Sequence, residues 1–145
     1  MNKTFLIGDF CFSLDYPAEI TPPPHFMIFE APGAVPEYAY TIRLARELPR
    51  PEGELMASRA DIRIFQKGEL ESRLIGIRGR ERFYACYCET SERSAEIALD
   101  RDAIRDLNID PVFTSLLALE RRLVEKGGMI LHCAYVEHRG EAILF

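Results

Sequence analysis

The stretch DIRIFQKGELESRLIGIRGRERFYACYCETSERSAEIALD, residues 61–100, decides the fold. Apolar and polar residues alternate along it, as they do in strands that bury one face. Lys67-Gly68 and Arg78-Gly79-Arg80 are tight-turn signals, and residues 90–93 form a polar loop. The stretch therefore predicts an antiparallel meander of four strands, at about residues 60–66, 69–77, 82–89 and 94–99.

Upstream of the meander the sequence also favours strands. Residues 4–14 alternate with a period of two and predict a single strand, whose apolar face carries Leu6, Phe10, Phe12 and Leu14. Residues 37–47 predict a half-buried strand with Tyr38, Tyr40, Ile42 and Leu44 on one face. Prolines at positions 22–24 separate the two, because proline cannot donate to a strand ladder.

Downstream of the meander the pattern changes to that of a helix. Asp110 is suited to the N-cap, Pro111 to the first helical position and Gly127-Gly128 to the end. Apolar residues at helical spacing form one stripe: Val112, Phe113, Leu116, Leu117, Leu123 and Val124. We therefore expect one amphipathic helix at about residues 111–126, followed by a hairpin of two apolar strands around the turn 138–140.

These elements predict an α+β fold with a mostly antiparallel sheet, one main helix and a C-terminal β-hairpin. We expect a β-rich region at residues 1–109 and a helix plus hairpin at 110–145, folded as one compact unit. The chain has 145 residues, 48% of them hydrophobic, and a net charge of −5. That acidity argues against a nucleic-acid partner, and no run approaches the ~18 apolar residues of a membrane-spanning helix. The N-terminus lacks the apolar core of a signal peptide, so the expected compartment is the cytoplasm.

Cys86 and Cys88 stand two residues apart on a predicted strand, so both should point to one face. Two interpretations are open. The pair could form a zinc site together with His132 and Cys133, or the thiols could be buried in the sheet as small apolar groups. We favour buried thiols, because the chain has no C-x-x-C pair of the kind that presents two ligands to zinc.

The densest basic cluster surrounds the predicted turn at residues 78–80 and consists of Arg73, Arg78, Arg80 and Arg82. It could bind an anion or an acidic partner. Alternatively it is a solvated hairpin end, balanced by Glu69, Glu71, Glu81 and Glu89, and we favour this interpretation because surface charge runs are usually solvated. Asp100, Asp102, Asp106 and Asp110 are expected to cap short helical turns rather than to bind Ca²⁺.

The last 19 residues, GGMILHCAYVEHRGEAILF, carry a resemblance. They resemble the segment that directly precedes the phosphate-binding loop in the superfamily of HPr kinase/phosphorylase and phosphoenolpyruvate carboxykinase. Gly128, His132, Cys133, Gly140 and the apolar strand at residues 142–145 match in kind and spacing. The resemblance implies that this chain is the N-terminal portion of an ATP-dependent kinase, and that ATP with Mg²⁺ or Mn²⁺ serves the complete protein. It also implies that His132 binds the divalent metal near the phosphate loop.

The phosphate loop G-x-x-x-x-G-K-S/T itself is absent from the sequence. Without it nothing cradles phosphates or holds Mg²⁺, so we expect no catalytic residues, no cofactor and no metal in this chain alone. Its partners would be the missing C-terminal kinase half and a protein or peptide that accepts the phosphoryl group. The alternative is a stand-alone β-rich binding domain without catalysis. An apolar edge strand near residues 143–145 could also form a homo-oligomer.

Overall fold

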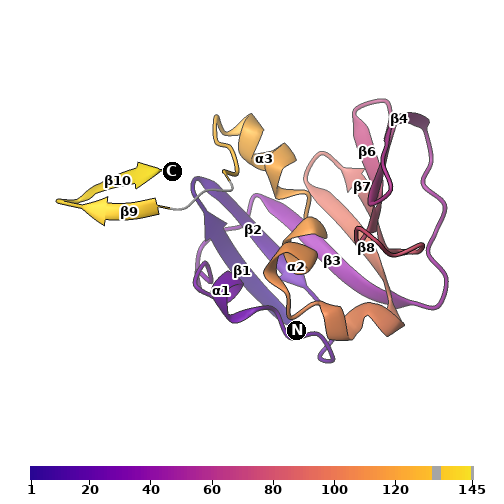
Figure 1. Ribbon diagram of the computed structural model, residues 1–145, viewed down its shortest axis with the longest axis horizontal. Coiled ribbons are helices and arrows are strands. Elements are labelled where there is room, and N and C mark those ends of the chain that lie inside the picture. The colour runs from indigo at the N-terminus through magenta and orange to yellow at the C-terminus, as the bar shows by residue number, and fades with distance from the viewer. Residues whose placement is uncertain (132–134, 145) are drawn as a thin grey trace.

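A computed structural model describes residues 1–131 and 135–144 (Figure 1). Eight strands form one mixed sheet in the order β1-β2-β3-β8-β7-β6-β5-β4. The strands are β1 (Asn2–Ile7), β2 (Phe10–Asp15), β3 (Tyr38–Ala45), β4 (Glu54–Ser58), β5 (Ile62–Lys67), β6 (Leu70–Gly76), β7 (Phe83–Ser91) and β8 (Ser94–Asp100). Short helical segments follow, and a separate two-stranded sheet completes the described part of the chain, so the predicted α+β class is confirmed.

The predicted meander is present as β5, β6, β7 and β8, each pairing antiparallel with the next. Gly68 and Gly79 both have positive φ angles, of 61° and 89°, which confirms the two turns that contain them. The β7–β8 connection is tighter than the predicted four-residue loop, since only Glu92 and Arg93 separate the strands. The sequence did not predict β4, because all five of its residues are exposed and it has no buried face to create an alternating pattern.

The single N-terminal strand that we expected is instead a hairpin of β1 and β2. A two-residue turn at Gly8 and Asp9 joins them, and Gly8 takes the positive φ of 57° that this turn requires. The turn changes which residues share a face, so that Phe5 lies directly opposite Phe12 and is fully buried. Leu6, which we had placed on the apolar face, is exposed.

The predicted helix at residues 111–126 is also corrected. The structure contains two shorter helices, α2 (Asp110–Ser115) and α3 (Leu119–Glu125), and Ile109 rather than Asp110 occupies the N-cap of α2. Ala118 breaks the helix with a left-handed φ of 45°. The break allows the four consecutive residues at 116–119 all to be buried, which one face of a continuous helix cannot do.

The predicted end of the helix is confirmed. Gly127 takes a φ of 71°, and the Gly128 N–H donates to the Leu123 carbonyl at 2.8 Å. This is the hydrogen bond of a Schellman motif, in which a glycine after the last turn satisfies an otherwise unpaired carbonyl. Earlier in the chain, the 3₁₀ helix η1 (Arg101–Asp106) begins at Asp100, whose side chain accepts from the Asp102 N–H as expected of a cap.

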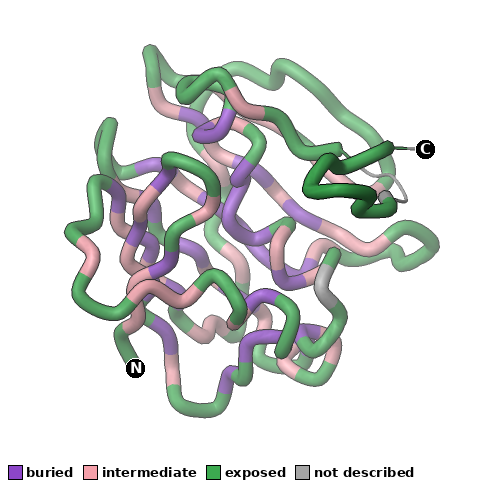
Figure 2. The backbone as a smooth tube through the Cα atoms, turned by 90° about the vertical axis from the view of Figure 1, so that its left-hand side faces the viewer, coloured by how far each residue is buried: buried purple, intermediate pink, exposed green. Residues whose placement is uncertain are grey.

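The core lies between the sheet and the helices, which cover one face of it (Figure 1). The small helix α1 (Pro24–Met27) contributes Phe26, whose ring is 4.9 Å from that of Phe113 on α2. Buried alternate residues of the strands complete this core, as Figure 2 shows. They are Phe5, Phe10, Phe12, Leu14, Tyr38, Tyr40, Ile42, Ala95, Ile97 and Leu99.

The predicted C-terminal hairpin is present as β9 (Tyr135–His138) and β10 (Glu141–Leu144), joined by Arg139 and Gly140. Both turn residues have positive φ, as in a type I′ turn. The hairpin is a sheet of its own and projects from the body of the molecule (Figure 1). Within the described residues, no helix has the length and apolar character needed to cross a membrane.

Candidate functional site: a charged cleft beside α3

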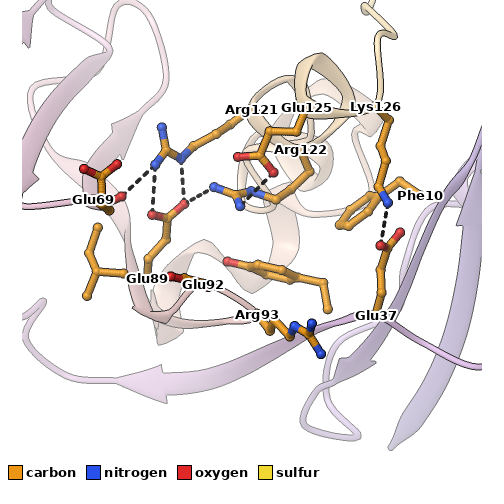
Figure 3. Close-up of a pocket in the computed structure, with 12 residues that line it drawn as sticks. Phe10, Glu37, Glu69, Glu89, Glu92, Arg93, Arg121, Arg122, Glu125 and Lys126 are labelled. Carbon is orange, nitrogen blue, oxygen red and sulfur yellow. Dashed lines mark hydrogen bonds and ion pairs between the residues drawn. The ribbon is translucent and has the colours of Figure 1, made fainter.

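A cleft of about 560 Å³ opens between α3, the start of β3, the start of β6 and the end of β7 (Figure 3). Tyr38 and Phe10 supply apolar surface, and the other side chains around it are mostly charged. The full lining is Phe10, Glu37, Tyr38, Glu69, Leu70, Glu89, Glu92, Arg93, Arg121, Arg122, Glu125 and Lys126. Five carboxylates and four cations thus face a single cleft.

Glu89 is the centre of the hydrogen-bonding network at this cleft. Its carboxylate accepts from the Glu71 backbone N–H at 2.8 Å and from the Tyr87 hydroxyl at 3.1 Å. Two guanidinium groups donate to it as well, Arg122 at 2.5 Å and Arg121 at 2.7 Å. Because its oxygens are occupied and it is buried, Glu89 anchors the surrounding structure and is poorly placed to accept a proton from a ligand.

The two arginines are neighbours on α3 and reach Glu89 from different sides (Figure 3). Arg121 also donates to the Glu69 carbonyl at 2.9 Å, which ties α3 to the β5–β6 turn. Arg122 also donates to Glu125 at 3.1 Å, within α3 itself. The sequence analysis did not identify either arginine as part of a site. The signal for their real role was that Glu89 is a carboxylate near the end of an otherwise apolar strand.

An aromatic ring packs against the buried Arg122. Its guanidinium carbon lies 5.2 Å from the centre of the Tyr38 ring, within the range of a cation–π contact. The Tyr38 and Tyr87 hydroxyls are 3.3 Å apart, and burial raises the pKa of both phenols and of Tyr40. These phenols therefore remain protonated at neutral pH. Tyr38 and Tyr87 serve as neutral hydrogen-bonding groups, whereas the buried Tyr40 hydroxyl has no hydrogen-bond partner among the described residues.

Closer to solvent, the rim of the cleft is held by a single long-range ion pair. Lys126, at the end of α3, donates to Glu37 at 2.5 Å, and this bond lowers the pKa of the Glu37 carboxyl. Arg93, in the β7–β8 turn, is exposed and forms no ion pair within the described part of the chain. It is therefore the cation most available to a ligand entering the cleft.

The predicted basic cluster does not form one patch. Arg73 lies on the helix-covered face of β6, is buried, and donates to Glu71 at 2.5 Å and to Glu120. Its role is to join β6 to α3, and it does not line the cleft.

Arg78, Arg80 and Arg82 are exposed around the β6–β7 turn. The structure brings Arg80 and Arg82 together on a second, shallower pocket, whose acidic lining consists of Glu81, Asp100, Asp102 and Asp106. Arg80 pairs with Asp106 through two bonds of 2.5 and 3.2 Å, and this pairing lowers the pKa of Asp106. The two arginines therefore face carboxylates of the same chain.

The residues of the zinc site that we considered and did not favour are only partly described. His132 and Cys133 lie outside the described residues. Cys86 and Cys88 do share one face of β7, as predicted, with their sulfur atoms 3.6 Å apart. Among the described residues, no group of three or more histidine, cysteine, aspartate or glutamate side chains could hold a metal ion.

Chemically, the cleft suits binding. Its lining includes no serine, threonine, cysteine or histidine, so the described residues that face it offer no ordinary nucleophile or histidine base. Its alternating carboxylates and guanidinium groups match a ligand that carries both signs of charge, such as a polypeptide segment. Comparisons of this chain with family models, curated proteins and solved structures find no match.

Proposed function

We propose that this chain is the N-terminal portion of an HPr-kinase-like, ATP-dependent kinase, and that it contributes partner or acceptor recognition rather than phosphoryl transfer. The observation that carries the proposal is the hairpin of β9 and β10. It lies in the segment that resembles the entry to a phosphate loop, and it is separate from the eight-stranded sheet.

The exposed apolar side chains of this hairpin support the proposal. Val136, Ile143 and Leu144 are 54%, 46% and 54% exposed, and Met129, Ile130 and Leu131 just before the hairpin are exposed as well. Contiguous exposed apolar side chains commonly mark a surface that another polypeptide covers. In this proposal the covering polypeptide is the phosphate-loop core, with the hairpin as its first two strands.

The resemblance assigns the remaining roles. ATP and Mg²⁺ or Mn²⁺ would bind the phosphate loop G-x-x-x-x-G-K-S/T in the complete protein. His132 would ligate the metal there, since a neutral imidazole suits Mn²⁺ but cannot form a site alone. The cytoplasm is the proposed compartment, because it keeps thiols reduced, and the described cysteines Cys11, Cys86 and Cys88 are free.

The charged cleft beside α3 is the proposed recognition surface. A protein or peptide acceptor carries both carboxylates and cations. The charged side chains of the cleft, which now pair with each other, could pair with those of the acceptor instead. Arg93 provides the first contact for an acidic side chain, since it forms no ion pair within the described residues.

The experiment is to read the coding frame beyond codon 145 and to express the longer product. A phosphate loop within a few codons, and ATP binding that depends on Mg²⁺ or Mn²⁺, are expected. The 145-residue chain should show no ATP binding in the same titration, and His132→Ala in the longer product should weaken Mn²⁺ binding. A stop codon, or a longer product that does not bind ATP, would overturn the proposal.

The second candidate is a stand-alone β-rich binding domain without catalysis. It is favoured by the core of the eight-stranded sheet, which α1, α2 and α3 close without the hairpin. Sedimentation at several concentrations separates the candidates. A hairpin that lacks its covering polypeptide should make the chain self-associate through the exposed strand edge, whereas a self-sufficient domain should keep one mass at all concentrations.

A further inference from the structure

Cys86 and Cys88 form a close thiol pair on the face of the sheet opposite the helices. Tyr87 stands between them and points toward the helix-covered face, where its hydroxyl meets Glu89. Alternate residues of a strand point to opposite faces, so both thiols project from the other side. Their sulfur atoms are 3.6 Å apart, in contact but not bonded, and the structure shows both cysteines as free.

The surroundings of the two thiols differ. The strand register places Leu74 and Ala98 on either side of Cys86, which is fully buried. It places Ser72 and Glu96 on either side of Cys88, which is half-buried. A small reagent can therefore approach Cys88 from solvent, while Cys86 is closed to solvent and in contact with the Cys88 sulfur.

The pKa values of the two thiols differ in the same sense as their exposure, with the lower pKa at the more exposed Cys88. A hydrogen bond from the Cys86 thiol, helped by one from Ser72, lowers the pKa of Cys88 to about 6, against the opposing effects of burial and of the Glu96 and Glu52 carboxylates. The same hydrogen bond and burial raise the pKa of Cys86. Cys88 is thus the thiolate and the nucleophile of the pair, and Cys86 is the protonated partner.

We propose that Cys88 and Cys86 form a peroxide-reactive site, in which the Cys88 sulfur is oxidised first and the adjacent Cys86 then closes a reversible disulfide. This site is independent of the proposed kinase role, because its residues lie on the face of the sheet away from α3 and the cleft. A metal site is a poorer fit, since the described residues supply no third ligand beside the two sulfurs.

The chemistry balances with hydrogen peroxide as the oxidant. The Cys88 thiolate attacks one peroxide oxygen, the O–O bond breaks, and the departing hydroxide takes a proton to become water, which leaves a sulfenic acid on Cys88. The Cys86 sulfur then attacks the Cys88 sulfur, the S–O bond breaks, and a second water leaves as the disulfide forms. Overall the two thiols lose two hydrogen atoms, and one peroxide becomes two waters.

Closing this disulfide requires a local change in β7. Alternate residues of a strand have Cα atoms about 6.6 Å apart, because each residue rises about 3.3 Å, and their Cα–Cβ bonds point the same way. Disulfides join Cα atoms separated by up to about 6.8 Å but hold the two Cβ atoms about 3.5–4.5 Å apart, so β7 must bend between Cys86 and Cys88 as the bond forms. The strain of that bend favours a bond that a thiol reductant can reopen.

The test uses the full chain with Cys11→Ser and Cys133→Ser, so that only the pair remains. At about pH 6, Cys88 in this variant should react with hydrogen peroxide about tenfold faster than an ordinary thiol does. A lower pKa increases the fraction of thiolate more than it reduces the intrinsic nucleophilicity of that thiolate. The matched control keeps Cys11 alone, with Cys86→Ala, Cys88→Ala and Cys133→Ser. Cys11 is also half-buried and lies on β2 of the same sheet.

Three readouts decide the proposal. Oxidation should lower the intact mass of the chain by two hydrogens, and peptide mapping should show a disulfide between Cys86 and Cys88. Dithiothreitol should reduce that disulfide again. In a Cys86→Ala variant, dimedone should trap the sulfenic acid on Cys88. A rate no higher than that of Cys11, or the absence of a dimedone adduct on Cys88, would overturn it. If a variant misfolds, the same peptide mapping is done on the unmutated chain. There, oxidation of Cys88 to sulfinic acid without a disulfide to Cys86 would contradict the proposal.

Discussion

Arg122 of α3 donates to Glu89 of β7 at 2.5 Å, and the two side chains are only 7% and 2% exposed. Removing both charges from water costs several kcal/mol for each, which one ion pair rarely recovers unless further hydrogen bonds satisfy the groups. Here Tyr87, Arg121 and the Glu71 N–H complete the shell of Glu89. The pair therefore fixes where α3 sits on the sheet, and with it the shape of the cleft.

Replacing Glu89 by glutamine should be strongly destabilising. The change keeps the size of the side chain but leaves the buried Arg122 and the partly buried Arg121 without their shared carboxylate. We expect the free energy of unfolding to fall by about 3 kcal/mol, measured by urea denaturation. The matched control is Glu92→Gln in the exposed β7–β8 turn, where a change below about 0.5 kcal/mol is expected. Equal effects for the two variants would show that Glu89 is not the anchor of α3.

The pair of Arg80 and Asp106 should make stability depend on pH in the acid range. Its hydrogen bond lowers the pKa of Asp106 in the folded chain, so the native state favours the carboxylate. The stabilisation is complete above the unfolded pKa of about 3.9 and is lost as the pH falls through the lower folded value. The difference in unfolding free energy between the unmutated chain and Asp106→Asn should therefore shrink as the pH falls below about 4.

The control for that prediction is Arg80→Gln, which removes the other partner. Because it deletes the same interaction, its difference from the unmutated chain should shrink over the same pH range. High salt should reduce both differences, since the Arg80 side chain is exposed. A difference that stays constant down to about pH 2 would mean that the ion pair contributes nothing through Asp106.

The alkylation rate of Cys88 should report the hydrogen bond from Cys86. With Cys11→Ser and Cys133→Ser in place, the rate of reaction with iodoacetamide should rise with pH around a midpoint near 6, as the lowered pKa of Cys88 requires. When Cys86→Ala is added, the Cys86 thiol no longer donates to Cys88. The midpoint of the pH dependence should then move up toward the pKa of about 8.5 of an ordinary thiol. An unchanged midpoint would assign the low pKa to some other group.

Substitutions in the C-terminal hairpin should leave the body of the chain stable. Ile143 is exposed, so Ile143→Ser should change the free energy of unfolding by less than about 0.5 kcal/mol. Leu116→Ala, at a fully buried position of the helix region, should cost about 2–5 kcal/mol in the same assay. Comparable losses in the two variants would show that the hairpin packs against the eight-stranded sheet and is not available to another polypeptide.

By itself, the sequence determined the elements whose signals are local. The alternation of residues 61–100, with glycines at both tight turns, was sufficient to place β5, β6, β7 and β8. Along β6 and β8 every second residue is buried and the residues between are less buried, which is the local pattern that the alternation predicts. The glycine stop after α3, the β9–β10 turn and the shared face of Cys86 and Cys88 follow from equally local rules.

Only the tertiary structure decided the features that depend on contacts far apart in the chain. The helix had to break at Ala118 so that residues 116–119 could all be buried, which periodicity alone does not reveal. The parallel pairing of β3 with β2 and β8 joins segments that no turn connects. The cleft exists because Glu89 and Arg122, 33 residues apart, meet in a space that excludes water. Ion pairs of this kind do not recur at a regular spacing in the sequence, because the packing of the helices on the sheet determines which charged side chains meet.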